Sequence, residues 1–195
     1  MCKPVPLILA SASASRRAML EAAGVPHSVI PAHIDERAAS AGMTEPGEVA
    51  LALARLKALE VSGRQPDELV IGSDSVVAVG GRRFDKPAGR AEAAEHLRFF
   101  SGKPMRLTSG VALARDGAVE WSHEETAVLH VRPLGEAFID SYLDAEWPAV
   151  GQCVGVFRIE GPGVQLFAAI DGDHFTILGM PLLALLGALR ERGAA

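Results

Sequence analysis

Short apolar runs alternate with segments of helical periodicity along most of the chain. Residues 6–10 form an apolar run that leads into small and polar residues, and a helix is expected to follow and to end before Gly24. Val49, Leu53 and Leu56 recur at the spacing of one helix face. Strands are predicted at 6–10, 27–30, 69–71, 76–79, 82–84, 105–113, 120–131, 154–157 and 164–170, and further helices from about 44–46 onward and at 90–100, 134–143 and 181–190.

This alternation of strands, helices and hairpins is typical of an α/β protein with a mixed central sheet. The chain has 195 residues, of which 49% are apolar, which is enough for one compact domain or for two lobes around a cleft. We therefore expect residues 1–195 to form a single α/β domain in which helices flank the sheet and ligands bind near strand ends.

Charge and cysteine content narrow the functional classes. The 19 Lys and Arg residues against 24 Asp and Glu residues give a net charge of −5, which disfavours a broad nucleic-acid-binding face. Cys2 and Cys153 are too few for a disulfide framework and fit a reducing compartment. The amino-terminal apolar stretch is too short for a signal peptide and is interrupted by Pro4 and Pro6. Because no run approaches the ~18 residues of a membrane span, we expect a cytoplasmic protein that binds neither nucleic acid nor membrane.

The first strand-to-helix turn offers groups that bind phosphate. Helix amino termini attract anions, and guanidinium groups bind phosphate through two hydrogen bonds. The alternative is an ordinary serine-capped helix with exposed arginines. The turn contains Ser11, Ser13, Ser15, Arg16 and Arg17.

Asp74 follows the apolar run at 69–71, where it could bind a hard divalent cation or deprotonate a water molecule. The alternative is an aspartate that fixes its own turn. Glu36 adds a second carboxylate in an acidic loop, and Lys57 and Lys86 could neutralise phosphate oxygens, although each alone is also typical of a solvated surface.

Other motifs are absent or structural. The histidines lack the paired spacing of a zinc site, and no Walker-type phosphate loop occurs. A leucine cluster near the carboxyl end predicts a buried helix face, although a dimer contact would use the same residues. The cluster comprises Leu182, Leu183, Leu185, Leu186 and Leu189.

Four blocks in order resemble the Maf-type nucleotide pyrophosphatases over nearly the whole chain. The first is Leu-Ala-Ser-Ala-Ser-Ala-Ser-Arg-Arg at 9–17, and the second is Ile-Asp-Glu at 34–36. The central block combines Ile-Gly-Ser-Asp-Ser at 71–75 with residues 85–87, 101–102 and 108–113, and the last combines residues 160–161 and 178–182.

The resemblance implies a two-lobed Maf/ITPase-like fold with its site in the cleft, dependence on Mg²⁺ or Mn²⁺, and possible homodimers. It implies that Asp74 accepts a proton from water, that Glu36 shares the metal and that Arg16, Lys57 and Lys86 hold the triphosphate. Water would then attack the α-phosphorus, and the products would be a nucleoside monophosphate and pyrophosphate.

In this family the favoured base is tied to positions that are Ser15, Ser75 and Glu160 in this chain. Glu160 resembles the branch that removes 7-methyl-GTP rather than the dTTP and UTP branch, and a carboxylate there could accept hydrogen bonds from a guanine edge. Ser15 and Ser75 depart from the bulkier residues of the 7-methyl-GTP branch, which leaves the base open.

Two other functions fit the same residues. One, which the resemblance to this family also implies, is a nucleotide-binding regulator of septum formation that would bind nucleotide without turnover. The other is a phosphatase in which Asp74 is a covalent nucleophile, and this reaction would release orthophosphate.

Overall fold

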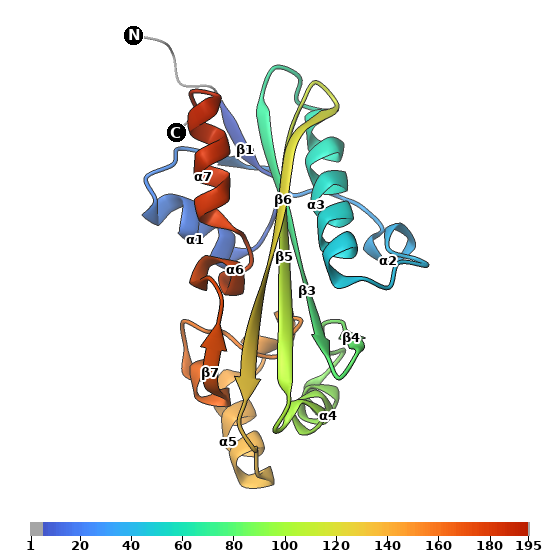
Figure 1. The fold of residues 1–195 in the computed structure, drawn as a ribbon, viewed down its shortest axis with the longest axis vertical. Coiled ribbons are helices and arrows are strands. Elements are labelled where there is room, and N and C mark those ends of the chain that lie inside the picture. The colour runs from blue at the N-terminus through green and yellow to red at the C-terminus, as the bar shows by residue number, and fades with distance from the viewer. Residues whose placement is uncertain (1–5, 195) are drawn as a thin grey trace. The chain divides into compact units, whose positions relative to one another are not determined.

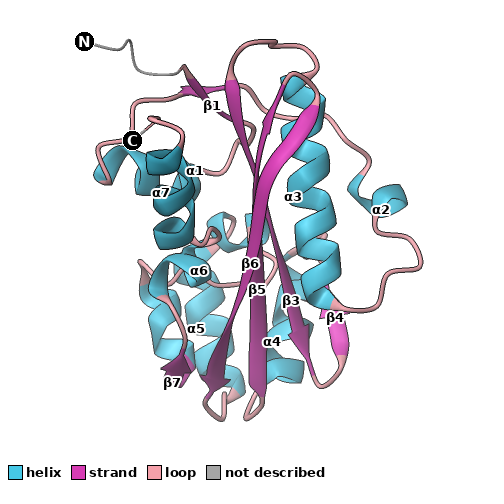
Figure 2. Cartoon of the chain, turned by 45° about the horizontal axis from the view of Figure 1, so that its top comes forward, coloured by secondary structure: helices cyan, strands magenta, loops and turns pink. Residues whose placement is uncertain are grey.

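The computed structural model describes residues 6–194, which form a seven-stranded sheet with accompanying helices (Figures 1 and 2). The strands are β1 (Leu7–Leu9), β2 (Ser28–Val29), β3 (Leu69–Val79), β4 (Arg82–Phe84), β5 (Pro104–Arg115), β6 (Ala118–Val131) and β7 (Phe167–Asp171). The α-helices are α1 (Ala14–Ala22), α2 (Glu36–Ala39), α3 (Pro46–Ser62), α4 (Arg90–Phe100), α5 (Glu136–Glu146), α6 (His174–Leu178) and α7 (Leu182–Glu191), and two 3-10 helices are η1 (Ala149–Gln152) and η2 (Pro162–Leu166).

The sheet is mixed, which confirms the predicted fold class. Its strand order is β2-β1-β3-β5-β6-β7, and β4 pairs with β3 outside this path. β1 runs parallel to both β2 and β3, whereas β4 is antiparallel to β3 and β7 is antiparallel to β6. In the part of the chain that the structure describes, no helix is long and apolar enough to span a membrane.

The chain divides into two compact units, each assembled from separate segments. The first unit takes in the described residues up to Ser75, then Thr108–Glu125 and the residues from His174 onward, and the second comprises Val76–Leu107 and Thr126–Asp173. The chain therefore passes from one unit to the other inside the long strands β3, β5 and β6, and once more between β7 and α6. The interpretation of residues 1–195 as a single domain stays a prediction.

One face of the sheet in the first unit packs against α1 and α7. Leu9 and Ile71 are fully buried there together with Leu185 and Leu189, and burial of each such side chain contributes about 1.5–3 kcal/mol. The predicted leucine face of α7 is thus confirmed as core, except that Leu183 is 62% exposed. Its neighbours Leu182 and Leu185 face inward, and a rotation of about 100° per helical residue turns position 183 outward.

The opposite face of β3 and β5 packs closely against α3 because small residues line the contact. Ala54 and Ala58 form a buried cluster with Ala112 and Ala114 of β5. The face predicted for α3 is correct for Val49 and Leu53 but wrong for Leu56, which is 38% exposed. The alanines complete the buried face in its place, and because they are small they allow the helix backbone to approach the sheet.

In the second unit, one predicted strand is wrong and another is shorter than predicted. Residues 154–157 are not a strand but a turn and the residues after it, and Val156 has a φ of 54°, which a β-strand does not allow. The strand predicted at 164–170 is confirmed from Phe167 onward as β7, whereas residues 164–166 belong to the 3-10 helix η2, which begins at Pro162.

His96 of α4 lies in an aromatic cluster of the second unit, where its ring centroid is 5.0 Å from that of Phe84 and 5.8 Å from that of Phe100. Its Nδ1 atom is buried without a hydrogen-bond partner among the described residues. Burial lowers the pKa of His96, and the nearby carboxylate of Glu92 opposes this shift only in part. The folded protein therefore favours the neutral ring.

We expect this histidine to make unfolding dependent on pH. Because its pKa is lowered in the folded state, the unfolded chain binds the proton more readily, so the stabilisation is complete above about pH 6.5 and is lost as the pH falls further. His96→Leu should have a smaller loss of unfolding free energy between pH 7 and pH 5 than the wild type, as measured by urea titration. The exposed His33 supplies the control, His33→Leu, which should keep the wild-type pH dependence. Equal slopes in wild type and His96→Leu would contradict the assignment.

Candidate active site

Asp74 lies in the middle of a continuous strand. The prediction of a strand that ends in a turn at this residue is wrong, because β3 runs on to Val79. The pairing with β1 covers Leu69 to Ile71, and the pairing with β4 begins at Val77. Asp74 therefore lies in the part of β3 between its pairing with β1 and its pairing with β4. The residue is 9% exposed.

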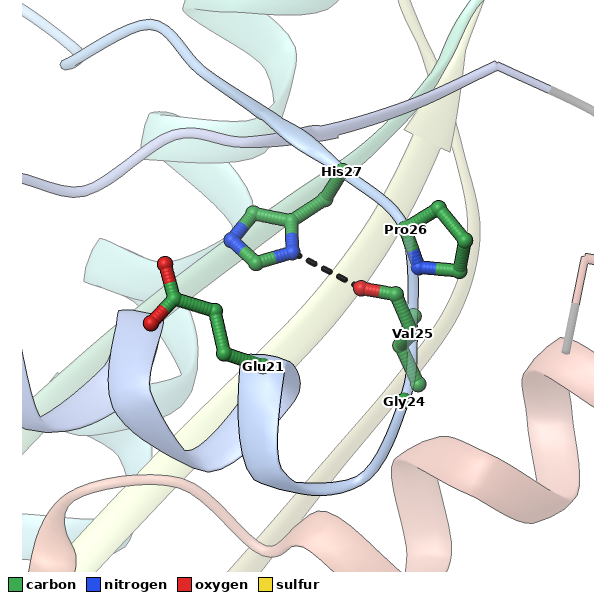
Figure 3. A pocket seen from close by; sticks show the side chains of 5 residues that line it. All are labelled: Glu21, Gly24, Val25, Pro26 and His27. Atoms are coloured by element: carbon green, nitrogen blue, oxygen red, sulfur yellow. Dashed lines mark hydrogen bonds between the residues drawn. The ribbon is translucent and has the colours of Figure 1, made fainter.

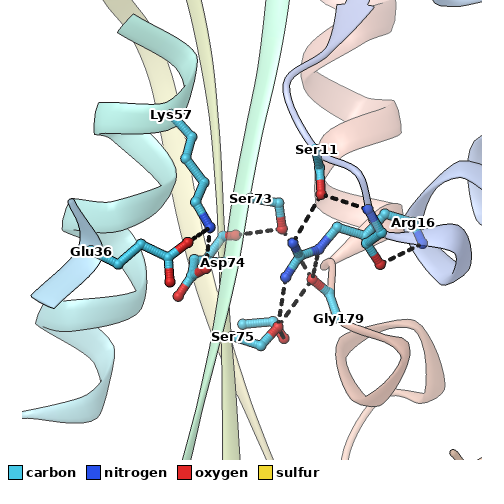
Figure 4. Close-up of polar contacts among 11 residues, drawn as sticks. Ser11, Arg16, Glu36, Lys57, Ser73, Asp74, Ser75 and Gly179 are labelled. Atoms are coloured by element: carbon cyan, nitrogen blue, oxygen red, sulfur yellow. Dashed lines mark hydrogen bonds and ion pairs between the residues drawn. The ribbon is translucent and has the colours of Figure 1, made fainter. Parts of the chain in front are cut away.

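Glu36, Lys57 and Asp74 form an ion-paired triad (Figure 4). The Nζ atom of Lys57 lies 2.6 Å from Oε1 of Glu36 and 2.6 Å from Oδ1 of Asp74. Lys57 reaches Asp74 from α3, which covers this face of β3. Such charge-assisted contacts are shorter and stronger than neutral hydrogen bonds. The three predicted residues are thus brought together within the first unit.

The second carboxylate is held by a short helix. The predicted acidic loop is wrong here, because Asp35 is the N-cap of α2 and its Oδ1 accepts a hydrogen bond of 3.0 Å from the backbone N–H of Ala38. Glu36 is consequently the first residue of that helix. Its side chain is 55% exposed, whereas those of Lys57 and Asp74 are each 12% exposed.

The donor set of the triad fits a divalent cation that arrives with a phosphorylated ligand. Two carboxylates face one ammonium group, which leaves one negative charge in excess. Mg²⁺ is typically bound by one or two carboxylates together with water and substrate phosphate oxygens. Within residues 6–194 no group of three His, Cys, Asp or Glu side chains is placed to hold a metal, so Glu36 and Asp74 would need those phosphate oxygens as further ligands.

Arg16 lies on the side of β3 that carries Ser73 and Ser75, opposite to Asp74 (Figure 4). Its Nε donates a hydrogen bond of 2.9 Å to the carbonyl oxygen of Gly179, and its Nη1 and Nη2 donate to the hydroxyls of Ser11 (3.3 Å) and Ser75 (3.0 Å). These bonds engage three of the five N–H groups of a guanidinium. The remaining two are the groups that a phosphate could use.

Burial lowers the pKa of Arg16, and the negative charges of Asp74 and Glu36 oppose this shift. Guanidinium groups nevertheless stay protonated in proteins, because their ordinary pKa exceeds ~12. Arg16 is only 9% exposed. The site thus holds a fixed, largely buried positive charge that can bind an anionic group such as a phosphate.

The other predicted phosphate-block residues differ in their surroundings. Ser13 is the N-cap of α1, and its hydroxyl accepts a bond of 3.4 Å from the N–H of Arg16. Ser11 is buried and also accepts from the N–H of Ser13 at 3.2 Å. Ser15 is partly buried, whereas Arg17 is exposed and lies 3.6 Å from Glu21 on the helix surface. The capping and phosphate-binding interpretations are therefore compatible for this turn.

Lys86 and Glu160 belong to the second unit. The pKa of the Cys153 thiol is raised mainly by burial and further by the negative charge of Glu160. The positive charges of Arg158 and Lys86 oppose this shift. Arg158 is fixed by two bonds to the buried carboxylate of Glu146, at 2.9 and 3.0 Å. Cys153 is a free thiol, and Cys2 lies outside the described residues.

Three residues of the first unit, Ser73, Ser109 and Gly179, were not predicted as site residues from the sequence. Ser73 is fully buried, and its hydroxyl lies 2.8 Å from the carbonyl oxygen of Gly110 and 3.0 Å from that of Gly179. Ser109 contacts the hydroxyl of Ser75 at 2.8 Å. All of these residues lie in the blocks that carry the family resemblance, so the resemblance could have pointed to them. Their hydrogen bonds, however, join segments that are too distant in sequence to be paired from residue spacing.

A pocket elsewhere in the first unit contains none of the predicted site residues. It measures about 330 Å³ and lies at the carboxyl end of α1 (Figure 3). There the Nδ1 atom of His27 lies 2.9 Å from the carbonyl oxygen of Val25. The lining residues are Glu21, Gly24, Val25, Pro26 and His27.

Comparison with known proteins finds relatives over nearly the whole chain. The family described as Maf-like protein matches residues 6–192. A nucleoside triphosphate pyrophosphatase of Nitrobacter winogradskyi is 49% identical over 189 residues, which cover 96% of this chain and 94% of that protein. A 7-methyl-GTP pyrophosphatase of Rhizobium etli is 50% identical over 191 residues, with 96% of each chain covered. A nucleoside triphosphate pyrophosphatase of Granulibacter bethesdensis is 47% identical over 192 residues, which cover 96% of this chain and 98% of that protein.

Proposed function

Because the chain belongs to the Maf family, it is a nucleoside triphosphate pyrophosphatase, and we propose that Asp74 is its catalytic proton acceptor. The observation that carries the proposal is the contact of Asp74 with Lys57 at 2.6 Å in a largely buried position. The ammonium group holds the carboxylate in place, and a positioned carboxylate can take a proton from water.

In the proposed reaction, water attacks the α-phosphorus while Asp74 accepts its proton, and the bond to the β-phosphate oxygen breaks to release pyrophosphate. Arg16 binds phosphate oxygens through its two remaining N–H groups and neutralises charge that moves to the leaving group. Lys57 keeps the two carboxylates together, and a role of Lys86 in triphosphate binding stays a prediction. Ser11, Ser13, Ser15 and Arg17 complete the phosphate-binding block.

A divalent cation, Mg²⁺ or Mn²⁺, would be held by Glu36 and Asp74 and would neutralise phosphate oxygens. The support for this proposal is the excess negative charge of the triad in the structure.

For the base, we propose 7-methylguanine. Two relatives, from Rhizobium etli and Rhizobium meliloti, are named 7-methyl-GTP pyrophosphatase and are 50% and 48% identical to this chain. Glu160 could accept hydrogen bonds from the N–H groups of a guanine edge. Ser15 and Ser75 are small, so the base would be held without an aromatic stacking partner at these two positions.

The proposed setting is the cytoplasm, where triphosphates are the substrates and neither nucleic acid nor membrane is a partner. A homodimer is proposed as well, on the resemblance to the family alone. The names of the relatives favour catalysis over a purely regulatory nucleotide-binding role.

A panel of triphosphates tests the function. Purified protein is incubated with each canonical triphosphate and with 7-methyl-GTP, in Mg²⁺, Mn²⁺ or EDTA, and pyrophosphate and orthophosphate are quantified separately. We expect pyrophosphate release to be fastest with 7-methyl-GTP and to be lost in EDTA. In water labelled with ¹⁸O, attack at the α-phosphorus places the label in the nucleoside monophosphate. Orthophosphate as the first product would favour the covalent phosphatase, and nucleotide binding without turnover would favour the regulator.

A further inference from the structure

Behind the guanidinium of Arg16, two serine hydroxyls and a helix carbonyl form a chain of short contacts. The hydroxyl of Ser75 accepts from Nη2 of Arg16 at 3.0 Å and lies 2.8 Å from the hydroxyl of Ser109. The hydroxyl of Ser109 in turn lies 2.8 Å from the carbonyl oxygen of Thr176, in α6. The contacts therefore connect α1, β3, β5 and α6 within the first unit.

The distances determine the direction of the protons in this chain. Each serine hydroxyl has one proton to donate. If Ser109 gives its proton to Thr176, the 2.8 Å contact requires Ser75 to donate to Ser109. The alternative, in which Ser75 donates to the carbonyl of Gly179, uses a longer contact of 3.2 Å. That carbonyl already accepts from Nε of Arg16 at 2.9 Å, so we assign the proton of Ser75 to the shorter contact of 2.8 Å with Ser109.

In this arrangement Ser109 controls which way the hydroxyl of Ser75 points. While Ser75 donates to Ser109, its lone pairs face Nη2 of Arg16. Each of the three guanidinium nitrogens then donates to a different acceptor, and together the three acceptors fix the plane of the guanidinium. They are the carbonyl of Gly179 and the hydroxyls of Ser11 and Ser75.

Ser109 itself is fully buried, so it acts on the substrate through other residues. We infer that Ser109 is a positioning residue that orients the Arg16 guanidinium for phosphate binding by accepting the proton of Ser75. The inference rests on the proposed role of Arg16 in the reaction. It also gives Ser75 a role in the site that does not require contact with the base.

The first test compares two buried serines of the first unit. Ser109→Ala removes the acceptor of Ser75, and kcat/KM for pyrophosphate release should fall about tenfold, chiefly through KM, because a hydrogen bond to a charged group is no longer supported. Ser62 is equally buried and accepts a bond of 2.9 Å from the N–H of Gly117, outside the site. Ser62→Ala should therefore keep the wild-type kcat/KM. A wild-type kcat/KM in Ser109→Ala would overturn the inference.

The second test separates positioning from a general structural effect. If Ser109 acts through Arg16, the double variant Arg16→Lys/Ser109→Ala should have the kcat/KM of Arg16→Lys within about twofold. If the two effects multiply instead, Ser109 acts independently of Arg16 and the inference is wrong. If Arg16→Lys alone has wild-type kcat/KM, it is the proposed role of Arg16 that fails.

The third test needs no turnover and so remains informative if the proposed function is wrong. The side-chain ¹⁵N–¹H signals of Arg16 are recorded by NMR in the protein without nucleotide. Ser109→Ala and Ser75→Ala should both shift or broaden these signals, whereas Ser62→Ala should not. Ser75→Ala covers the case in which Ser109→Ala fails to fold, since Ser75 is less deeply buried. Unchanged Arg16 signals in a folded Ser109→Ala or Ser75→Ala protein would contradict the proposed chain.

Discussion

Asp74→Asn is expected to lower kcat for pyrophosphate release by about 10³-fold, within the range that a positioned general base contributes. The amide has nearly the size of the carboxylate and can still accept a hydrogen bond from Lys57, but it cannot take up a proton from water. The measurement is pyrophosphate release at saturating triphosphate and Mg²⁺, together with a thermal unfolding curve to establish that the variant is folded.

A carboxylate on α3 provides the matched control for this variant. Glu60 lies in the helix that carries Lys57 and pairs at 2.8 Å with Arg64, which follows the end of that helix. Surface pairs of this kind contribute little to stability, so Glu60→Gln should keep kcat within about twofold of the wild type. Full metal-dependent turnover in Asp74→Asn would show that another group accepts the proton.

Gly72→Ala is expected to reduce the free energy of unfolding by about 4 kcal/mol or more. A Cβ atom at this position would lie 2.5 Å from the backbone nitrogen of Ala58 and even nearer to the carbonyl oxygen of Ala54. Both atoms belong to the α3 backbone, so the helix must move as a whole. Since a domain is typically stable by about 5–15 kcal/mol, much of the stability would be lost. Urea unfolding at neutral pH provides the measurement.

A glycine in open space separates this steric effect from the general consequence of replacing glycine. In α7, a Cβ atom at Gly187 would meet no atom within 4 Å. Gly187→Ala should therefore leave stability unchanged or raise it by up to about 1 kcal/mol, through helix propensity. A normal unfolding midpoint in Gly72→Ala would mean that α3 does not pack against β3 as the structure has it.

Much of the fold follows from periodicity, and the exceptions have local causes. The helix predicted at 90–100 and the strands predicted at 105–113 and 120–131 are confirmed as α4, β5 and β6. The predicted strand at 154–157 failed because an apolar run does not reveal a left-handed residue such as Val156. A turn was predicted within β3 because Gly72 and the polar residues after it are typical of turns. The strand continues through these residues instead, where it packs against α3.

Part of the candidate site could likewise be predicted from the sequence, and part could not. The sequence motifs brought Asp74, Glu36 and Lys57 into one hypothesis, and the structure places them within ion-pair distance. The partners of Arg16 could not be derived, because Gly179 is 163 positions away and contributes only a backbone carbonyl. Every residue has such a carbonyl, so no side-chain pattern distinguishes this one.

The segmented makeup of the first unit affects the order in which the protein can mature during synthesis. Leu7 and Leu9 of β1 share a buried cluster with Leu182, Leu185 and Leu189 of α7. Domains generally fold as units when their residues have emerged from the ribosome. The amino-terminal strand and the phosphate-binding turn after it must therefore wait for α7 before their core can close. The segments of the second unit end at Asp173, so they are all available earlier. Phosphate binding by the newly made chain would then be one of the last properties it acquires.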